Sequence, residues 1–117
     1  MLNIQSLMNN YFVNKISEIR TKYNQELVNF EAARKISFFV INEIENGLRY
    51  GKLLENGFVR FKLDNSLLKN IGVIQSSEIH LQLSKCIDFF NGFGINAEKD
   101  SEIIEKEGFV YFLDVKP

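Results

Sequence analysis

The chain has 117 residues, which is the length of one domain and short for two. Hydrophobic residues make up 45% of it and charged residues 25%, and 14 Lys and Arg against 15 Asp and Glu leave a formal net charge of −1, so no overall field favours a nucleic-acid or membrane partner. The single Cys and the single His exclude an internal disulfide framework and a zinc site built from several cysteines.

The N-terminal part of the chain has the pattern of amphipathic helix, because apolar residues recur there at steps of three or four. An unbroken helix would be a rod of about 70 Å. Such a rod could bury the apolar stripe along one of its faces only against another chain. A break at residues 24–29 would let two helices fold back as a hairpin, and Phe30 to Leu48 has the pattern of a separate domain helix. We expect a break or bend there, with Gly51 as the left-handed residue that follows the second helix.

The middle of the chain predicts one strand and two helices. Residues 58–63 alternate apolar and basic side chains, as a half-buried strand does. Residues 64–66 offer caps for a short helical turn at 67–71. Ser76 and Ser77 offer caps for a longer helix that ends at Asn91 and Gly92.

The C-terminal part predicts two more strands. One begins at residues 94–97, residues 98–107 form a solvated acidic loop, and residues 109–115, apolar on both faces, form a central strand. The expected fold class is α+β: a long N-terminal helix or helical hairpin, followed by a small three-stranded, mainly antiparallel sheet packed with one helix. We expect residues 1–52 as the helical segment and residues 53–117 as the α+β unit of one folded domain.

The residue types that carry catalysis fail on geometry. His80, Ser84 and Asp88 share one face of a helix, but a triad needs His between Ser and Asp. Cys86 lies about 240° around the helix from His80, so the two cannot share a metal or a proton, and Cys86 is expected to be a small core residue. We therefore expect a protein that is not an enzyme, with no catalytic residue, no metal and no cofactor.

The N-terminal apolar stripe gives the first functional hypothesis, because so long a seam exceeds what the small downstream unit needs for its own core. We expect self-association through the N-terminal helices, as a coiled-coil dimer or larger symmetric assembly that binds an unidentified protein partner or a small ligand. The alternative is a hairpin within one chain. Phe12, Tyr23, Phe30 and Phe38 are bulky for a two-stranded coil, which favours a hairpin or a wider bundle. The candidate interface residues are Met8, Phe12, Ile16, Ile19, Tyr23 and Leu27.

The second functional hypothesis is a nucleic-acid-binding protein, because charge is unevenly distributed. Residues 49–69 carry five basic and two acidic side chains, a net charge of +3, whereas residues 98–107 carry −3. A strand face with Arg60 and Lys62 beside Phe58 could contact phosphate and stack a base. An ordinary charged solvent face is the favoured interpretation, because the domain as a whole is not basic. The candidate ligand contacts are Arg49, Phe58, Arg60, Lys62 and Lys69.

From Ala33 onward the chain shows a helix with a Gly-Lys stop, a strand, a helix that ends in Gly-aromatic, and a closing hairpin. These pieces are residues 44–52, 58–63, 90–94 and 109–115. The layout resembles a loose class of small phage and mobile-element proteins over about 85 residues, and departs from it at residues 53–57 and after Glu98. The resemblance implies a viral accessory protein that binds a host factor, and it transfers no functional residue.

The sequence also bears on location. The N-terminus lacks the basic and apolar regions of a signal peptide. The apolar run at residues 38–41 is far shorter than the roughly 20 residues of a membrane span, and one unpaired Cys fits a reducing compartment. We expect a soluble cytoplasmic protein without a membrane partner.

Overall fold

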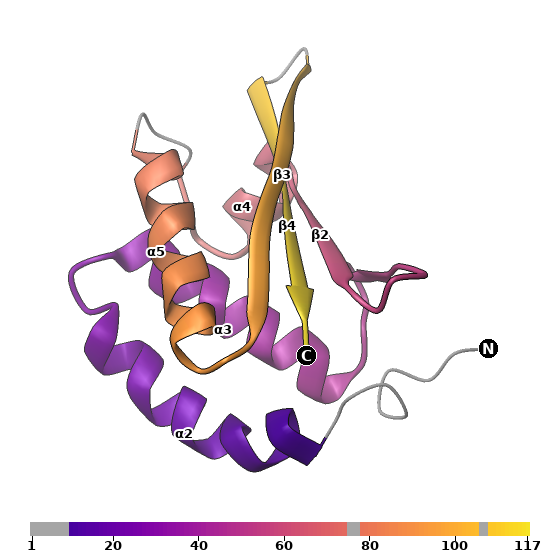
Figure 1. Cartoon of the computed structure of the whole chain (residues 1–117). Coiled ribbons are helices and arrows are strands. Elements are labelled where there is room, and N and C mark those ends of the chain that lie inside the picture. The colour runs from indigo at the N-terminus through magenta and orange to yellow at the C-terminus, as the bar shows by residue number, and fades with distance from the viewer. Residues whose placement is uncertain (1–9, 75–77, 106–107) are drawn as a thin grey trace.

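The computed structural model describes residues 10–74, 78–105 and 108–117, which form helices and one antiparallel sheet (Figure 1). The α+β class is as predicted, but within these residues the sheet has four strands where the sequence predicts three. In chain order the elements are α2 (Asn10–Glu26), α3 (Glu31–Asn46), β1 (Lys52–Leu53), β2 (Val59–Leu63), α4 (Asn65–Asn70), α5 (Ile79–Gly92), β3 (Asn96–Glu105) and β4 (Gly108–Lys116). The expected caps of α5, Ser76 and Ser77, lie outside the described residues.

The long N-terminal helical stretch is interrupted at residues 27–30, which overlap the segment where a break is expected. α3 runs back along α2, and side chains tie the two helices at both ends. Arg20 donates to the Asn42 side-chain oxygen at 3.1 Å, and Arg34 donates to that of Asn24 at 3.0 Å. α2 and α3 therefore form a helical hairpin within the chain.

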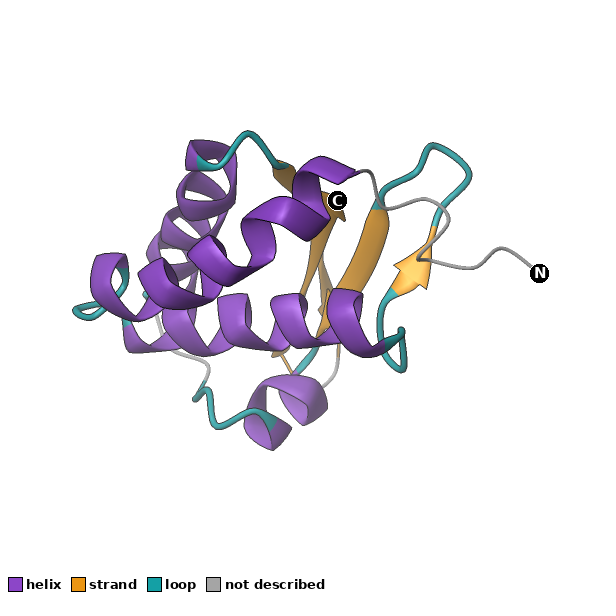
Figure 2. Cartoon of the chain, turned by 90° about the horizontal axis from the view of Figure 1, so that it is seen from below, coloured by secondary structure: helices purple, strands orange, loops and turns teal. Residues whose placement is uncertain are grey.

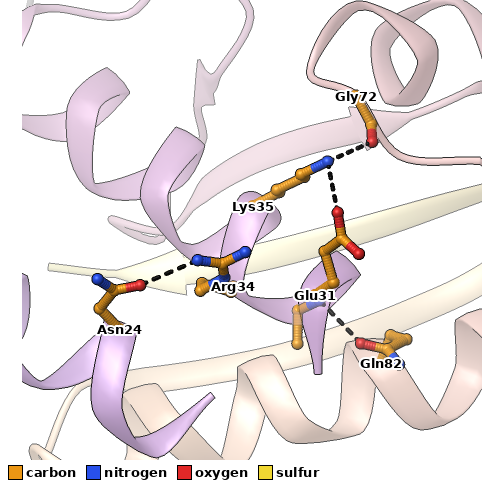
Figure 3. A network of polar contacts seen from close by, with 7 residues as sticks. Asn24, Glu31, Arg34, Lys35, Gly72 and Gln82 are labelled. Carbon is orange, nitrogen blue, oxygen red and sulfur yellow. Dashed lines mark hydrogen bonds and ion pairs between the residues drawn. The ribbon is translucent and has the colours of Figure 1, made fainter. Parts of the chain in front are cut away.

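The first turn of α3 receives its cap from another helix. The residue before it, Phe30, makes no side-chain capping hydrogen bond. Instead, Gln82 of α5 accepts the backbone N–H of Ala33 at 2.9 Å (Figure 3). The first N–H groups of a helix have no partner inside it, so this contact satisfies one of them and fixes α5 against the start of α3.

The sheet has the order β1-β2-β4-β3, and all neighbouring strands are antiparallel. Because β2 and β3 each pair with β4, they run parallel to each other, and the chain crosses between them through α4 and α5. The β2–β4 register runs from Val59 opposite Val115 to Leu63 opposite Tyr111. β4 is thus a central strand, as its two apolar faces indicate.

The prediction of a solvated acidic loop at residues 98–107 is wrong as far as Glu105, because β3 continues to that residue. β3 lies at the edge of the sheet and pairs with β4. Glu98 and Lys99 are exposed there, and charged side chains are common on edge strands because they discourage pairing with other chains. β1 was not expected either, since a strand of two residues has no recognisable pattern.

One hydrophobic core joins the helical hairpin to the rest of the chain. The helices α2, α3 and α5 lie on one face of the sheet (Figures 1 and 2). β2 turns Val59, Phe61 and Leu63 toward them, with the alternation that the sequence predicts. The core side chains that are 0% exposed include Ile19, Ile36, Val40, Ile44, Phe61, Leu83, Phe90 and Leu113.

The glycine that ends α3 is Gly47 and not the expected Gly51. Gly47 has a φ of 94°, which favours glycine over residues with a side chain. Gly51 has a different role, because a Cβ atom there would lie 2.8 Å from the ring of Phe61. The segment that leaves α3 therefore packs directly on β2.

Candidate functional site

The six candidate interface residues belong to the N-terminal seam. Ile19 and Leu27 are buried in the core of the chain, 0% and 3% exposed. An interface between chains through either residue would require α2 to leave this core, so the seam has the packing of the intramolecular alternative. Of the other four, Ile16 and Tyr23 pack partly against the core, Met8 lies outside the described residues, and only the backbone of Phe12 is described.

Two of the five candidate ligand contacts lie beside partners on the sheet. Arg60 donates through Nε and Nη2 to the two carboxylate oxygens of Asp114 on β4, both at 2.9 Å. The Asp114 side chain is 6% exposed and that of Arg60 31%, and the guanidinium lies 5.0 Å from the centre of the Phe112 ring. Phe58 lies against the ammonium group of Lys116, 5.7 Å from the ring centre. The charge of Arg60 is therefore offset within the sheet.

Two other candidates, Lys62 and Lys69, line the same hollow, which has a volume of about 650 Å³. We call it the α4 hollow. Its lining residues are Tyr50, Lys62, Asp64, Ser66, Leu67, Lys69 and Asn70. The fifth candidate, Arg49, is exposed in the loop beside Tyr50 and is not part of this lining. The structure thus brings two of the five predicted contacts together and adds an aromatic ring.

Local sequence explains why both lysines reach the hollow. Lys62 lies at an outward position of β2 and is exposed. Asp64 caps α4, since its Oδ1 accepts the backbone N–H of Leu67 at 2.8 Å. Leu67 and Leu68 are buried, which leaves Lys69 exposed in the last turn. The cap and the buried leucines therefore fix α4, and with it the position of Lys69 relative to β2.

Tyr50 is the aromatic residue that lines the hollow, and it was not among the candidate contacts. Its side chain is 55% exposed, and its ring centre lies 6.0 Å from that of Phe39 on α3. Its backbone N–H donates to Glu43 at 2.8 Å. The sequence contains one signal that could have indicated this segment, which is Glu43. An acid seven residues after Ile36 lies on the apolar face of the helix and needs hydrogen-bond donors there.

A second, smaller hollow of about 250 Å³ adjoins Phe39 and is lined mainly by apolar surface. Lys35 lies on its rim, but its ammonium group contacts the Gly72 carbonyl at 2.9 Å and Glu31 at 3.0 Å (Figure 3). The hydrogen bond from Lys35 lowers the pKa of the Glu31 carboxyl. The cation of this hollow is thus engaged within the chain. The lining residues are Lys35, Phe38, Phe39, Asn42, Glu43 and Ile71.

Cys86 and His80 do not have the surroundings of a catalytic nucleophile and its general base. Cys86 is 0% exposed and lies 3.1 Å from the Ser37 hydroxyl, and burial raises the pKa of its thiol to about 12. His80 is exposed, and its Nδ1 lies 2.8 Å from the ammonium nitrogen of Lys99. Because a protonated lysine can only donate, His80 Nδ1 accepts in this contact. The thiol therefore acts as a packing group, as predicted.

The described residues contain no cluster of three or more His, Cys, Asp or Glu side chains that could hold a metal ion. Over the same residues, none of the helices has the length and apolar composition that crossing a membrane requires. Comparison of the chain with protein-family models, with curated proteins and with solved structures finds no match.

Proposed function

We propose that this chain is a non-enzymatic binding protein whose α4 hollow takes a segment of single-stranded nucleic acid. The observation that supports the proposal is the placement of Lys62, Lys69 and the exposed ring of Tyr50 around one hollow of about 650 Å³. This is the second of the two functional hypotheses drawn from the sequence, with Tyr50 added and with Arg60 assigned to the sheet.

The chemistry of the hollow matches the two parts of a nucleotide. Lysine ammonium groups bind phosphate as point charges, and an exposed aromatic ring stacks on any base. The volume of about 650 Å³ falls within the range of about 300–1,000 Å³ that small-ligand sites occupy. Asp64 adds one negative charge to the lining, and the hydrogen bond that its Oδ1 accepts from α4 does not remove that charge. With two lysines and one aspartate, the lining carries a formal net charge of +1.

Fluorescence anisotropy with labelled single strands of DNA and RNA, each about 15 nucleotides long, tests the proposal at low salt. We expect Lys62→Glu with Lys69→Glu to weaken binding at least about tenfold and to reduce the slope of log affinity against log salt by about 1.4, since each phosphate contact on a single strand contributes about 0.7. Tyr50→Ala should weaken binding without changing this slope. Tyr50→Phe, which keeps the aromatic ring, should retain the affinity of the wild type.

The matched control is Lys15→Glu with Lys22→Glu, which makes the same change in net charge on α2, beside a different, smaller hollow. We expect it to weaken binding far less than the Lys62 and Lys69 pair. No binding at low salt, or equal losses for the two double variants, would contradict the proposal.

Self-association, and the role of a phage accessory protein that binds a host factor, stay predictions from the sequence. The burial of Ile19 and Leu27 within the chain argues against a dimer that forms through these two residues. Light scattering at high protein concentration decides this point: a stable dimer would return the seam, or another surface, to consideration as an interface.

A further inference from the structure

Glu43 is a buried acid that holds three consecutive backbone N–H groups. The residue is 7% exposed. Its Oε1 accepts the N–H groups of Arg49 at 3.1 Å, Tyr50 at 2.8 Å and Gly51 at 3.0 Å. A buried carboxylate is stable only when hydrogen bonds replace its hydration, and three donors on one oxygen provide such a replacement. Glu43 thus anchors the segment that leaves α3 by its backbone.

The anchored segment is also held from the other side. The ladder between β1 and β2 ends at Lys52 opposite Arg60, and the residues before Lys52 turn toward Glu43 instead. Gly51 lies so close to β2 that a Cβ atom would meet the Phe61 ring at 2.8 Å. Residues 49–51 are therefore fixed between α3 and the sheet.

This clamp has a consequence for the α4 hollow. Tyr50 is the middle residue of the clamped segment, and its ring leans on Phe39 while 55% of the side chain stays exposed. An exposed aromatic on an unanchored loop must be ordered when a ligand stacks on it, which weakens binding, whereas an anchored ring is ordered beforehand. We propose that Glu43 is a positioning residue that presents Tyr50 to the ligand of the α4 hollow, an inference that rests on the proposed function.

The test is a double-mutant cycle between Glu43 and Tyr50, read by the affinity for the single-stranded oligonucleotide. We expect Glu43→Ala to weaken binding about fivefold or more, because Tyr50 must then be ordered on binding. Glu43→Gln keeps one acceptor oxygen and should restore most of the affinity. In a Tyr50→Ala background, Glu43→Ala should have little further effect. Ile44→Val, which perturbs the buried face of the same helix, should leave the affinity unchanged.

A readout that needs no ligand completes the experiment. Nuclear magnetic resonance relaxation of the backbone amides should show greater mobility at residues 49–51 in Glu43→Gln, and more in Glu43→Ala where that variant folds, with α3 unchanged. Equal mobility in wild type and both variants would overturn the inference. If the wild type binds, two results of the affinity measurement would also overturn the inference. One is that Glu43→Ala binds as tightly as the wild type. The other is that Glu43→Ala loses the same affinity in the Tyr50→Ala background as in the wild type. Failure of the wild type to bind overturns the proposed function instead.

Discussion

Replacing Arg60 with Ala tests whether this arginine holds the sheet together or meets the ligand. Its guanidinium makes two hydrogen bonds of 2.9 Å to Asp114. The side chain of Asp114 is 6% exposed and that of Arg60 is 31% exposed. Removing one partner of a fully buried ion pair costs about 3–5 kcal/mol, and exposed pairs contribute about 0–1 kcal/mol. Since one partner is buried and the other is not, we expect Arg60→Ala to lower the free energy of unfolding by about 2 kcal/mol.

Urea denaturation followed by circular dichroism measures this change, and a cycle with Asp114→Asn separates the pair from other contacts of Arg60. We expect the two substitutions to be less costly together than the sum of the single changes. The affinity of Arg60→Ala for the oligonucleotide should match wild type under conditions where both are folded. The reasoning is refuted if Arg60→Ala unfolds within about 0.5 kcal/mol of wild type, or if it loses as much affinity as Lys69→Ala.

Four further predictions concern the packing of the helices. Ile19→Ala should lower the free energy of unfolding by about 2–5 kcal/mol, because Ile19 is 0% exposed. An unfolding midpoint that depends on protein concentration would instead show that the folded protein self-associates. Cys86 should react with a thiol reagent at pH 8 only as the protein unfolds, and rapid labelling of the native state would contradict its burial. Because the pKa of Cys86 is raised from 9.0 to about 12, its contribution to stability is complete below pH 9 and lost as the pH rises toward 12; Cys86→Ala should therefore reduce that loss. Gln82→Ala should cost about 1 kcal/mol, as other helix caps do, and Gln82→Glu should cost less because it retains an acceptor for the Ala33 N–H.

The elements that the sequence predicts well are those whose pattern is local. β2 alternates over five residues, and Asp64 stands directly before the helix it caps, so neither depends on distant contacts. The start of β3 falls within the strand predicted to begin at residues 94–97, but its continuation to Glu105 was missed because that part is defined by its pairing with β4 and not by its own composition, which is acidic. The cap of α3 was missed for the same reason, since Gln82 reaches it from 49 residues away.

The candidate site could be predicted only in part. Lys62 and Lys69 were found as basic residues close in sequence, and the cap of α4 does bring them to one hollow. Arg60 carries the same charge, and only the position of Asp114 on a strand 54 residues later shows that it is paired. Tyr50 follows a helix with no pattern around it, and the turn that presents it depends on three backbone contacts to Glu43.

Mapping the bound oligonucleotide on the protein surface tests the proposed site most directly. In a titration followed by ¹H–¹⁵N correlation spectra, we expect the largest shift changes at Tyr50, Lys62 and residues 66–70 of α4, with saturation at one oligonucleotide segment per chain. The resonances of α2 should change little. Changes concentrated on α2 or on β3 at the far edge of the sheet, or no changes at low salt, would contradict a nucleic-acid site at the α4 hollow.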